Sequence, residues 1–121
     1  MARNNTLGTQ GELIAKEYLE KLDYEILEEN WTFKKAELDL VAYKDQTIIF
    51  VEVKTRSGNG FGQPEDFVNE AKQKLLVLAA EEYIHLMDHR GEIRFDIISI
   101  LFTADDKHIL RHIEDAFWPE A

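Results

Sequence analysis

Residues 37–54 read ELDLVAYKDQTIIFVEVK, a pattern of two β-strands joined by a polar turn. The first half, residues 37–43, alternates between two faces, as a half-buried strand does. The second half contains an unbroken run of β-branched and aromatic residues at 48–51, which is typical of a strand covered on both faces. This run continues directly into Glu52 and Lys54. Charged side chains are rare in buried strands, so the hairpin is predicted to carry a charged site.

The turn determines which residues of this hairpin face each other. A two-residue loop at 45–46, or a four-residue loop with the same centre, places Asp39 opposite Glu52 and Glu37 opposite Lys54. Opposed residues share one face of the sheet, with Cβ atoms about 4.5–5.5 Å apart. Two carboxylates are therefore predicted to meet inside an apolar hairpin, although a three-residue loop would break this apposition.

Two carboxylates at this separation repel each other unless a proton or a cation lies between them. With an effective dielectric constant of about 20, the repulsion is roughly 3 kcal/mol. A divalent ion relieves it, and Mg²⁺ typically binds one or two carboxylates together with water and phosphate oxygens. Lys54 lies on the same face as Glu52 and could point its ammonium at the same phosphate. The alternative is that these charged residues lie near strand ends and are solvated.

The order of acidic and basic residues resembles a known nuclease pattern. Asp39, twelve intervening residues and Glu52-x-Lys54 resemble the core of the PD-(D/E)XK nucleases. FVEVKTR at 50–56 and ELD at 37–39 resemble the small bacterial YraN-like family, which is similar to the archaeal Holliday-junction resolvases. The likeness extends over nearly the whole chain, through GxxGE at 8–12, Asn30, Phe61-Gly62, Lys72, RFD at 94–96 and Ala116-Phe117.

This resemblance implies a restriction-endonuclease-like core and metal-dependent hydrolysis of nucleic-acid phosphodiester bonds, on DNA that includes branched forms such as Holliday junctions. The implied cofactor is Mg²⁺ or Mn²⁺. The implied catalytic set is Glu12, Asp39, Glu52 and Lys54, whose three carboxylates would bind the metal, and Glu37 is a weaker candidate. The resemblance also suggests a homodimer, because a four-way junction offers two symmetric cuts. The alternative function is a binding module that keeps the nuclease-like scaffold without turnover.

Glu12 belongs to a predicted first helix, in which apolar residues recur at helical spacing from about residue 7 to residue 22. Gly8 and Gly11 each cost roughly 1 kcal/mol relative to alanine, which predicts a close approach of the helix backbone to another element. Glu12 lies at the edge of the apolar stripe and could lean toward the carboxylate pair. The alternative is a capping box with Thr9, if the helix begins there.

Four basic residues are candidates for contacting phosphate: Lys34, Lys35, Arg56 and Lys72. Lys34 and Lys35 follow a predicted edge strand at 24–33, in a turn where solvated lysines are common. Lys72 begins the otherwise apolar stripe of a second helix. Its ammonium is expected either to extend to water or to reach the phosphate site, and the resemblance favours the phosphate site.

The net charge of −10 argues against a nucleic-acid ligand, because phosphate binding normally relies on a basic surface. Between residues 34 and 74, however, seven basic and seven acidic residues balance each other, so the excess negative charge lies elsewhere. An acidic surface away from the site helps solubility and does not exclude a nucleic-acid partner. Nonspecific affinity for DNA is expected to be weak.

The length and composition predict one domain spanning residues 1–121, because 121 residues with 45% apolar and 11% aromatic content can form one core. No apolar run is long enough to cross a bilayer, and the first residues lack the apolar segment of a secretory signal. The absence of cysteine excludes disulfides and thiolate metal sites. We therefore expect a cytoplasmic protein without a membrane partner.

The remaining segments complete a predicted α/β fold, with a central mixed sheet of about five strands flanked by two main helices. The second helix is predicted at 66–88, after a glycine-rich loop in which Phe61 either folds onto the core or stacks on a base. Two further strands are predicted at 92–102 and 107–113.

Other polar residues are predicted to be structural. Arg94 and Asp96 share a strand face and are expected, with Arg56, to form an ion pair that supports the fold. The four histidines lack a third ligand at a spacing familiar from zinc sites, so solvated histidines are expected. They form two pairs in the sequence, His85 with His89 and His108 with His112.

Overall fold

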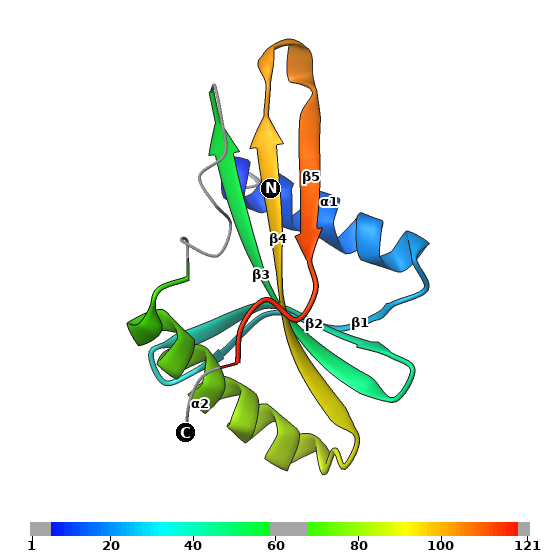
Figure 1. The fold of residues 1–121 in the computed structure, drawn as a ribbon, viewed down its shortest axis with the longest axis vertical. Coiled ribbons are helices and arrows are strands. Elements are labelled where there is room, and N and C mark those ends of the chain that lie inside the picture. Colours follow the sequence, from blue (N-terminus) through cyan, green and yellow to red (C-terminus); the bar gives the residue numbers. More distant parts are fainter. Residues whose placement is uncertain (1–5, 59–67, 119–121) are drawn as a thin grey trace, which may run out of the picture.

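The computed structural model describes residues 6–58 and 68–118 as a five-stranded mixed sheet with a long helix on each face (Figure 1). Neighbouring strands follow chain order, and only the β3–β4 pair is parallel. The predicted α/β fold with a central mixed sheet and two main helices is confirmed. The elements are α1 (Leu7–Lys21), β1 (Glu25–Phe33), β2 (Ala36–Lys44), β3 (Thr47–Ser57), α2 (Glu70–Met87), β4 (Glu92–Phe102), the 3₁₀ turn η2 (Ala104–Asp106) and β5 (His108–Ile113).

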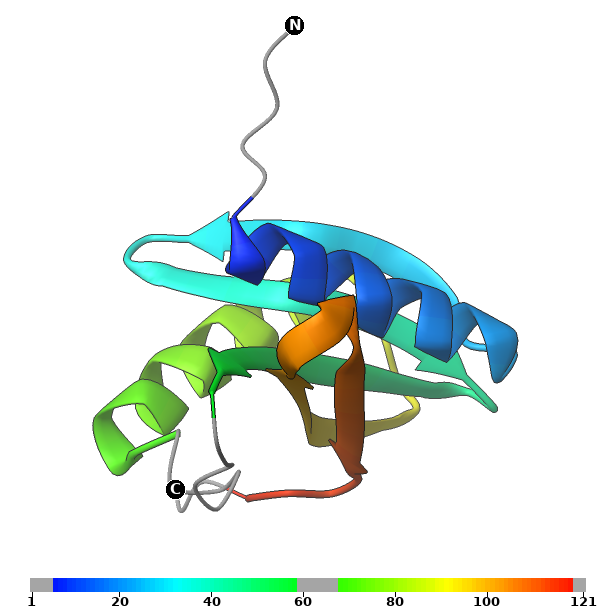
Figure 2. The same ribbon diagram turned by 90° about the horizontal axis from the view of Figure 1, so that it is seen from above.

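The alternation of side chains along the strands divides the core into two layers, one under each helix. On β3, Phe50 packs in the cluster that α2 covers, whereas Ile49 and Val51 pack in the cluster that α1 covers. In Figure 2 the two helices lie well apart, with α1 passing in front of β1 and β2 and α2 lower in the view. The run at 48–51 is therefore covered on both faces, as its sequence predicts. Within the described residues, neither helix is long and apolar enough to cross a membrane.

The β2–β3 hairpin has the predicted register. Lys44 pairs with Thr47, and the ladder continues to Leu40 and Val51. The two-residue turn consists of Asp45 and Gln46, whose φ angles are 52° and 64°. Positive φ at both central positions is the geometry of the tight turns that match the twist of two antiparallel strands.

Helix α1 begins earlier than a capping box at Thr9 requires. Thr6 is the N-cap, and its Oγ1 accepts a hydrogen bond from the Thr9 amide at 3.1 Å. Glu12 therefore lies in the second turn of the helix, away from the cap. Gly11 packs against β3, and a Cβ atom there would lie 1.9 Å from Thr55 Cγ2. The predicted close approach of this helix to another element is confirmed at Gly11.

Helix α2 begins at Glu70 rather than at residue 66. Asn69 caps it, with its side-chain oxygen accepting from the Lys72 amide at 2.9 Å. Val68 is buried but precedes the helix. Phe61 lies outside the described residues.

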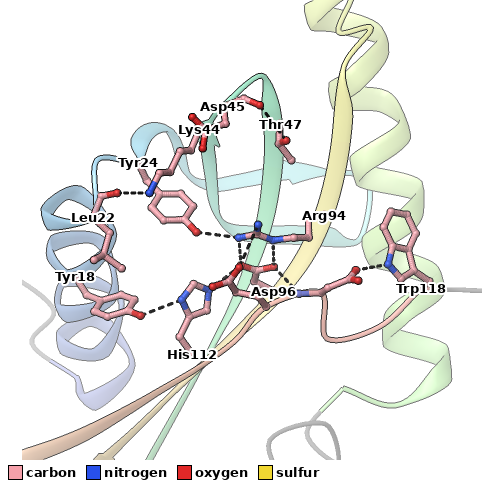
Figure 3. Close-up of polar contacts among 12 residues, drawn as sticks. Tyr18, Leu22, Tyr24, Lys44, Asp45, Thr47, Arg94, Asp96, His112 and Trp118 are labelled. Atoms are coloured by element: carbon pink, nitrogen blue, oxygen red, sulfur yellow. Dashed lines mark hydrogen bonds and ion pairs between the residues drawn. The ribbon is translucent and has the colours of Figure 1, made fainter.

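A buried polar cluster joins α1, β4 and β5 (Figure 3). The Asp96 carboxylate, which is fully buried, accepts two hydrogen bonds from Arg94 at 2.8 Å and one from His112 Nε2 at 2.7 Å. The Tyr18 hydroxyl lies 3.0 Å from the other His112 ring nitrogen, and Arg94 also donates to the Tyr24 hydroxyl. The structural ion pair of Arg94 with Asp96 is therefore observed.

The prediction of solvated histidines is wrong for His112, whose side chain is only 6% exposed. Sequence spacing did not indicate this burial because it depends on α1 and β4 packing against β5. Arg56, predicted to join the ion pair, is exposed at the end of β3, and its guanidinium donates to the Thr55 carbonyl at 3.0 Å.

Candidate functional site

Asp39 on β2 and Glu52 on β3 lie side by side just beyond the last paired residues of the hairpin. Both are buried, with exposed fractions of 9% and 3%. The two carboxyl groups are close enough for each to shift the pKa of the other, and Asp39 Oδ2 accepts from the Val53 amide at 2.9 Å. The predicted apposition of two carboxylates inside an apolar hairpin is observed.

The two carboxyl groups titrate as a pair. Burial and the adjacent Glu52 raise the pKa of Asp39 to about 9, and the Val53 amide only partly opposes this effect. Burial also acts to raise the pKa of Glu52, but the hydrogen bond from Asp39 and the Lys72 and Lys54 ammonium groups lower it below its usual range. The pair therefore keeps one proton at neutral pH, held mainly on Asp39.

Two lysines converge on the same oxygen of Glu52. Lys54, two residues along β3, has its ammonium 3.6 Å from Glu52 Oε2, and Lys72, from the first turn of α2, forms an ion pair with the same atom. Burial and the neighbouring Lys72 lower the pKa of Lys54. Burial alone would lower the pKa of Lys72, but its bond to Glu52 raises it. The site thus contains two different lysines. Lys72 keeps its proton more firmly than a free lysine, whereas Lys54 gives up its proton more readily.

Glu12 approaches this pair from α1. Its side chain is partly buried, and burial together with the charges of Glu37 and Glu52 raises its pKa, while a hydrogen bond from Asn30 acts in the opposite direction. The charge of Glu12 in turn raises the pKa of Asp39. Glu12 is thus near enough for its charge to act on the pair, but within residues 6–58 and 68–118 no three acidic or histidine side chains are grouped closely enough to hold a metal ion.

The other four candidate residues are exposed, unlike the buried carboxylate pair. Glu37, Lys34 and Lys35 are exposed, and the Lys34 ammonium lies 5.4 Å from the centre of the Phe33 ring. Arg56 is exposed further along β3. The structure therefore brings Lys54 and Lys72 to the carboxylate pair but leaves the other three basic candidates at its periphery.

A pocket of about 310 Å³ opens directly beside the carboxylate pair. One wall comes from the start of β2 and the other from the first two turns of α2. The lining residues are Lys35, Ala36, Glu37, Asp39, Ala71, Lys72, Leu75 and Leu76. Sequence reasoning did not find this pocket, because it depends on how α2 is placed against β2.

Comparison with known proteins assigns the family. Residues 11–100 match the family described as Uncharacterised protein family UPF0102. The chain belongs to this family. It is 49% identical to a UPF0102 protein of Flavobacterium psychrophilum over 98% of both chains, and 44% identical to one of Bacteroides fragilis over 98% of both chains. A UPF0102 protein of Clostridium perfringens is 40% identical over 94% of this chain and 95% of its own.

UPF0102 is the YraN-like group of the nuclease superfamily, so the resemblance noted in the sequence is confirmed at the level of the family. The names of these relatives state no activity. What the chain does must therefore be argued from the site itself.

Sequence reasoning missed two contacts of this site. The ion pair of Lys72 with Glu52 was not predicted, although a lysine that interrupts an apolar helical stripe was a visible signal. The bond between Asn30 and Glu12 was also missed. Asn30 has a φ of 53°, a conformation that asparagine tolerates better than most residues.

Proposed function

We propose that this protein hydrolyses phosphodiester bonds of nucleic acid, with DNA as the substrate and Mg²⁺ or Mn²⁺ as the cofactor. The observation that carries the proposal is the buried pair of Asp39 and Glu52, with two lysines on the same carboxylate. Burying this pair is costly, because Asp39 must keep a proton that it would lose in water at neutral pH. Such an arrangement is typical of a site that binds a cation and acts on an anionic substrate.

The residues present fit a divalent ion. Asp39 and Glu52 supply hard oxygen ligands, and Glu12 adds negative charge nearby without lying in a close group of three. Lys72 already places one positive charge on Glu52, which indicates that the pair attracts cations. Mg²⁺ often uses only one or two carboxylates, and water and substrate phosphate complete its shell. When bound, such an ion lowers the pKa of a coordinated water and stabilises charge on the phosphate.

The chain's own residues have separate roles in this proposal. Lys54, whose pKa is lowered, orients the attacking water and accepts or relays its proton. Lys72 stays charged and holds a phosphate oxygen once the substrate arrives. Lys34, Lys35 and Arg56 provide further positive charge for the strand on either side of the scissile bond.

A second candidate function is a nucleic-acid or protein binding module without turnover. The observation that favours it is the lack, in the described part of the chain, of three acidic side chains grouped closely enough for a metal. The two functions differ in one outcome: a binding module retains DNA affinity but leaves the strand intact in the presence of Mg²⁺ or Mn²⁺.

The test is cleavage of a panel of labelled substrates, comprising single strand, duplex, flap and four-way junction, with Mg²⁺ or Mn²⁺. Replacing Lys54 by alanine should slow cleavage by about 10²–10⁴-fold, because the water loses its proton acceptor, while the melting temperature stays near that of the wild type. Lys74→Ala is the matched control, since Lys74 is an exposed lysine of α2 that does not line the pocket. Equal rates for the two variants would remove the assigned role of Lys54.

A further inference from the structure

We infer that the pocket beside the carboxylate pair receives one unpaired nucleobase of the DNA strand that is cut. This inference rests on the proposed function and specifies the form of its substrate. It assigns Leu75 and Ala71 as base-contacting residues and predicts a preference for nucleotides that lie outside a continuous duplex.

The pocket has the size and the asymmetry that such an occupant needs. Its volume of about 310 Å³ is at the lower end of the range for small-molecule sites, which suits a single nucleotide unit and not a stack of bases. Ala71, Leu75 and Leu76 form an apolar wall on the α2 side, whereas Lys35 and Lys72 carry positive charge at the same opening, next to the carboxyl groups of Glu37 and Asp39. A nucleotide has the same asymmetry, with a flat, largely apolar face on the base and negative charge on the phosphate.

Leu75 is the most informative residue of this wall. It is 42% exposed although it lies beside a charged site, and it lines the pocket together with the buried Leu76. Apolar side chains that stand free beside phosphate-binding lysines often contact bases that have left the stack. Lys72 connects the two parts of the site, because it lines the pocket and also pairs with Glu52.

The position of the pocket limits the substrate. Asp39 contributes both to the pocket and to the carboxylate pair, so a base held there belongs to a nucleotide next to the scissile phosphate. A base of an intact duplex cannot enter unless it unstacks and unpairs, which costs free energy. Single strands and the unpaired nucleotides at flaps and junctions avoid this cost. The site should therefore favour such substrates over continuous duplex.

The experiment compares two leucines of the same helix with nearly equal exposure. Leu75 (42%) lines the pocket, whereas Leu78 (41%) does not. Each is replaced by aspartate, so both variants add the same negative charge to α2. The probe is a single-stranded oligonucleotide that contains 2-aminopurine, whose fluorescence rises when the base unstacks, bound by each variant in a Lys54→Ala background with Ca²⁺ to prevent cleavage.

The expected result is that Leu75→Asp binds the oligonucleotide about tenfold more weakly than Leu78→Asp and loses the rise in 2-aminopurine fluorescence. Similar affinities and fluorescence for the two variants would overturn the inference while leaving the proposed function intact. Equal affinity of the Lys54→Ala protein for single strand and duplex would also overturn it. If the wild type neither binds nor cuts any nucleic acid, the proposed function fails, and the inference fails with it.

Discussion

Asp39 is the residue that links stability to the proposed chemistry. Its pKa is raised from an ordinary value near 3.8 to about 9, so between these pH values the folded chain binds a proton that the unfolded chain lacks. The free energy of unfolding should therefore fall as pH rises through this window, by at most about 1.4 kcal/mol per pH unit, and should stop falling above about pH 9. Glu52 acts at the acidic end, since its lowered pKa contributes stability that is lost below its ordinary value near 4.5.

Asp39→Asn should remove this loss of stability with rising pH. The amide oxygen can still accept from Val53, and the amide NH₂ can donate to Glu52, so the variant should gain about 1–3 kcal/mol in chelator at pH 8. Thermal melts across the pH range measure the effect. Asp45→Asn is the control, because Asp45 is an exposed turn residue and its replacement should leave the wild-type pH profile unchanged. A variant at Asp39 that is less stable than wild type would identify Asp39 as an ordinary structural carboxylate.

For individual residues, the sequence predicts the contacts that are made within one hairpin. The apposition of Asp39 with Glu52 follows from a two-residue turn with positive φ, and both features are encoded within the same 18 residues. The ion pair of Lys72 with Glu52 could not be predicted, because it depends on where a separate helix docks. The burial of His112 has the same explanation, since α1 supplies the tyrosine that covers it.

At the scale of elements, Asp96 connects the parts of the fold that lie away from the candidate site. Besides its bonds to Arg94 and His112, it accepts a hydrogen bond from the Asp115 amide at 3.0 Å, just after β5. Figure 3 shows these contacts between α1, β4 and the segment that follows β5. One fully buried carboxylate thus bonds to β4, to β5 and to the segment after β5, and α1 joins the cluster through the contact of Tyr18 with His112.

Asp96→Ala should cost about 3–5 kcal/mol of stability, because it removes the buried counterion of a partly buried Arg94 and leaves only the exposed Glu114 to pair with it. Chemical denaturation measures the loss. The control is Arg90→Ala, which breaks an ion pair between Arg90 and Asp88 that is 85% and 80% exposed, and should leave the denaturation midpoint unchanged. If both variants unfold at the same denaturant concentration, the buried cluster does not anchor these elements.

The order and type of the helices and strands could be predicted, but the start of α2 could not. Alternation and apolar runs indicate all five strands, and β4 has the predicted limits. The apolar spacing suggested a helix from residue 66, yet Asn69 caps it and Glu70 begins it. A buried residue before a helix has the same apolar character as one inside it, and Val68 is such a residue.

At the scale of the whole molecule, the net charge of −10 predicts weak DNA affinity with a modest salt dependence. About three or four basic residues near the site can contact phosphate. A plot of the logarithm of the association constant against the logarithm of salt concentration should therefore have a slope of roughly −2 to −3 on single strands. Fluorescence anisotropy at several salt concentrations measures this slope.

Lys35→Ala should reduce the magnitude of that slope by about 0.7, the value of one phosphate contact on single-stranded DNA. Lys21→Ala is the control, because Lys21 is an exposed lysine in the last turn of α1. Equal slopes for the two variants would mean that Lys35 does not contact the nucleic acid.

The most direct test of the account is the effect of Mg²⁺ on the stability of the wild type and of Asp39→Asn. An ion that binds only the folded protein stabilises it by RT ln(1 + [L]/Kd), so the measurement needs no substrate. Four melting curves suffice, for both proteins in chelator and in millimolar Mg²⁺. We expect the variant to melt higher in chelator, Mg²⁺ to raise the melting temperature of the wild type, and the variant to gain much less. Equal shifts for the two proteins, or no shift in the wild type, would contradict a metal site at Asp39 and Glu52.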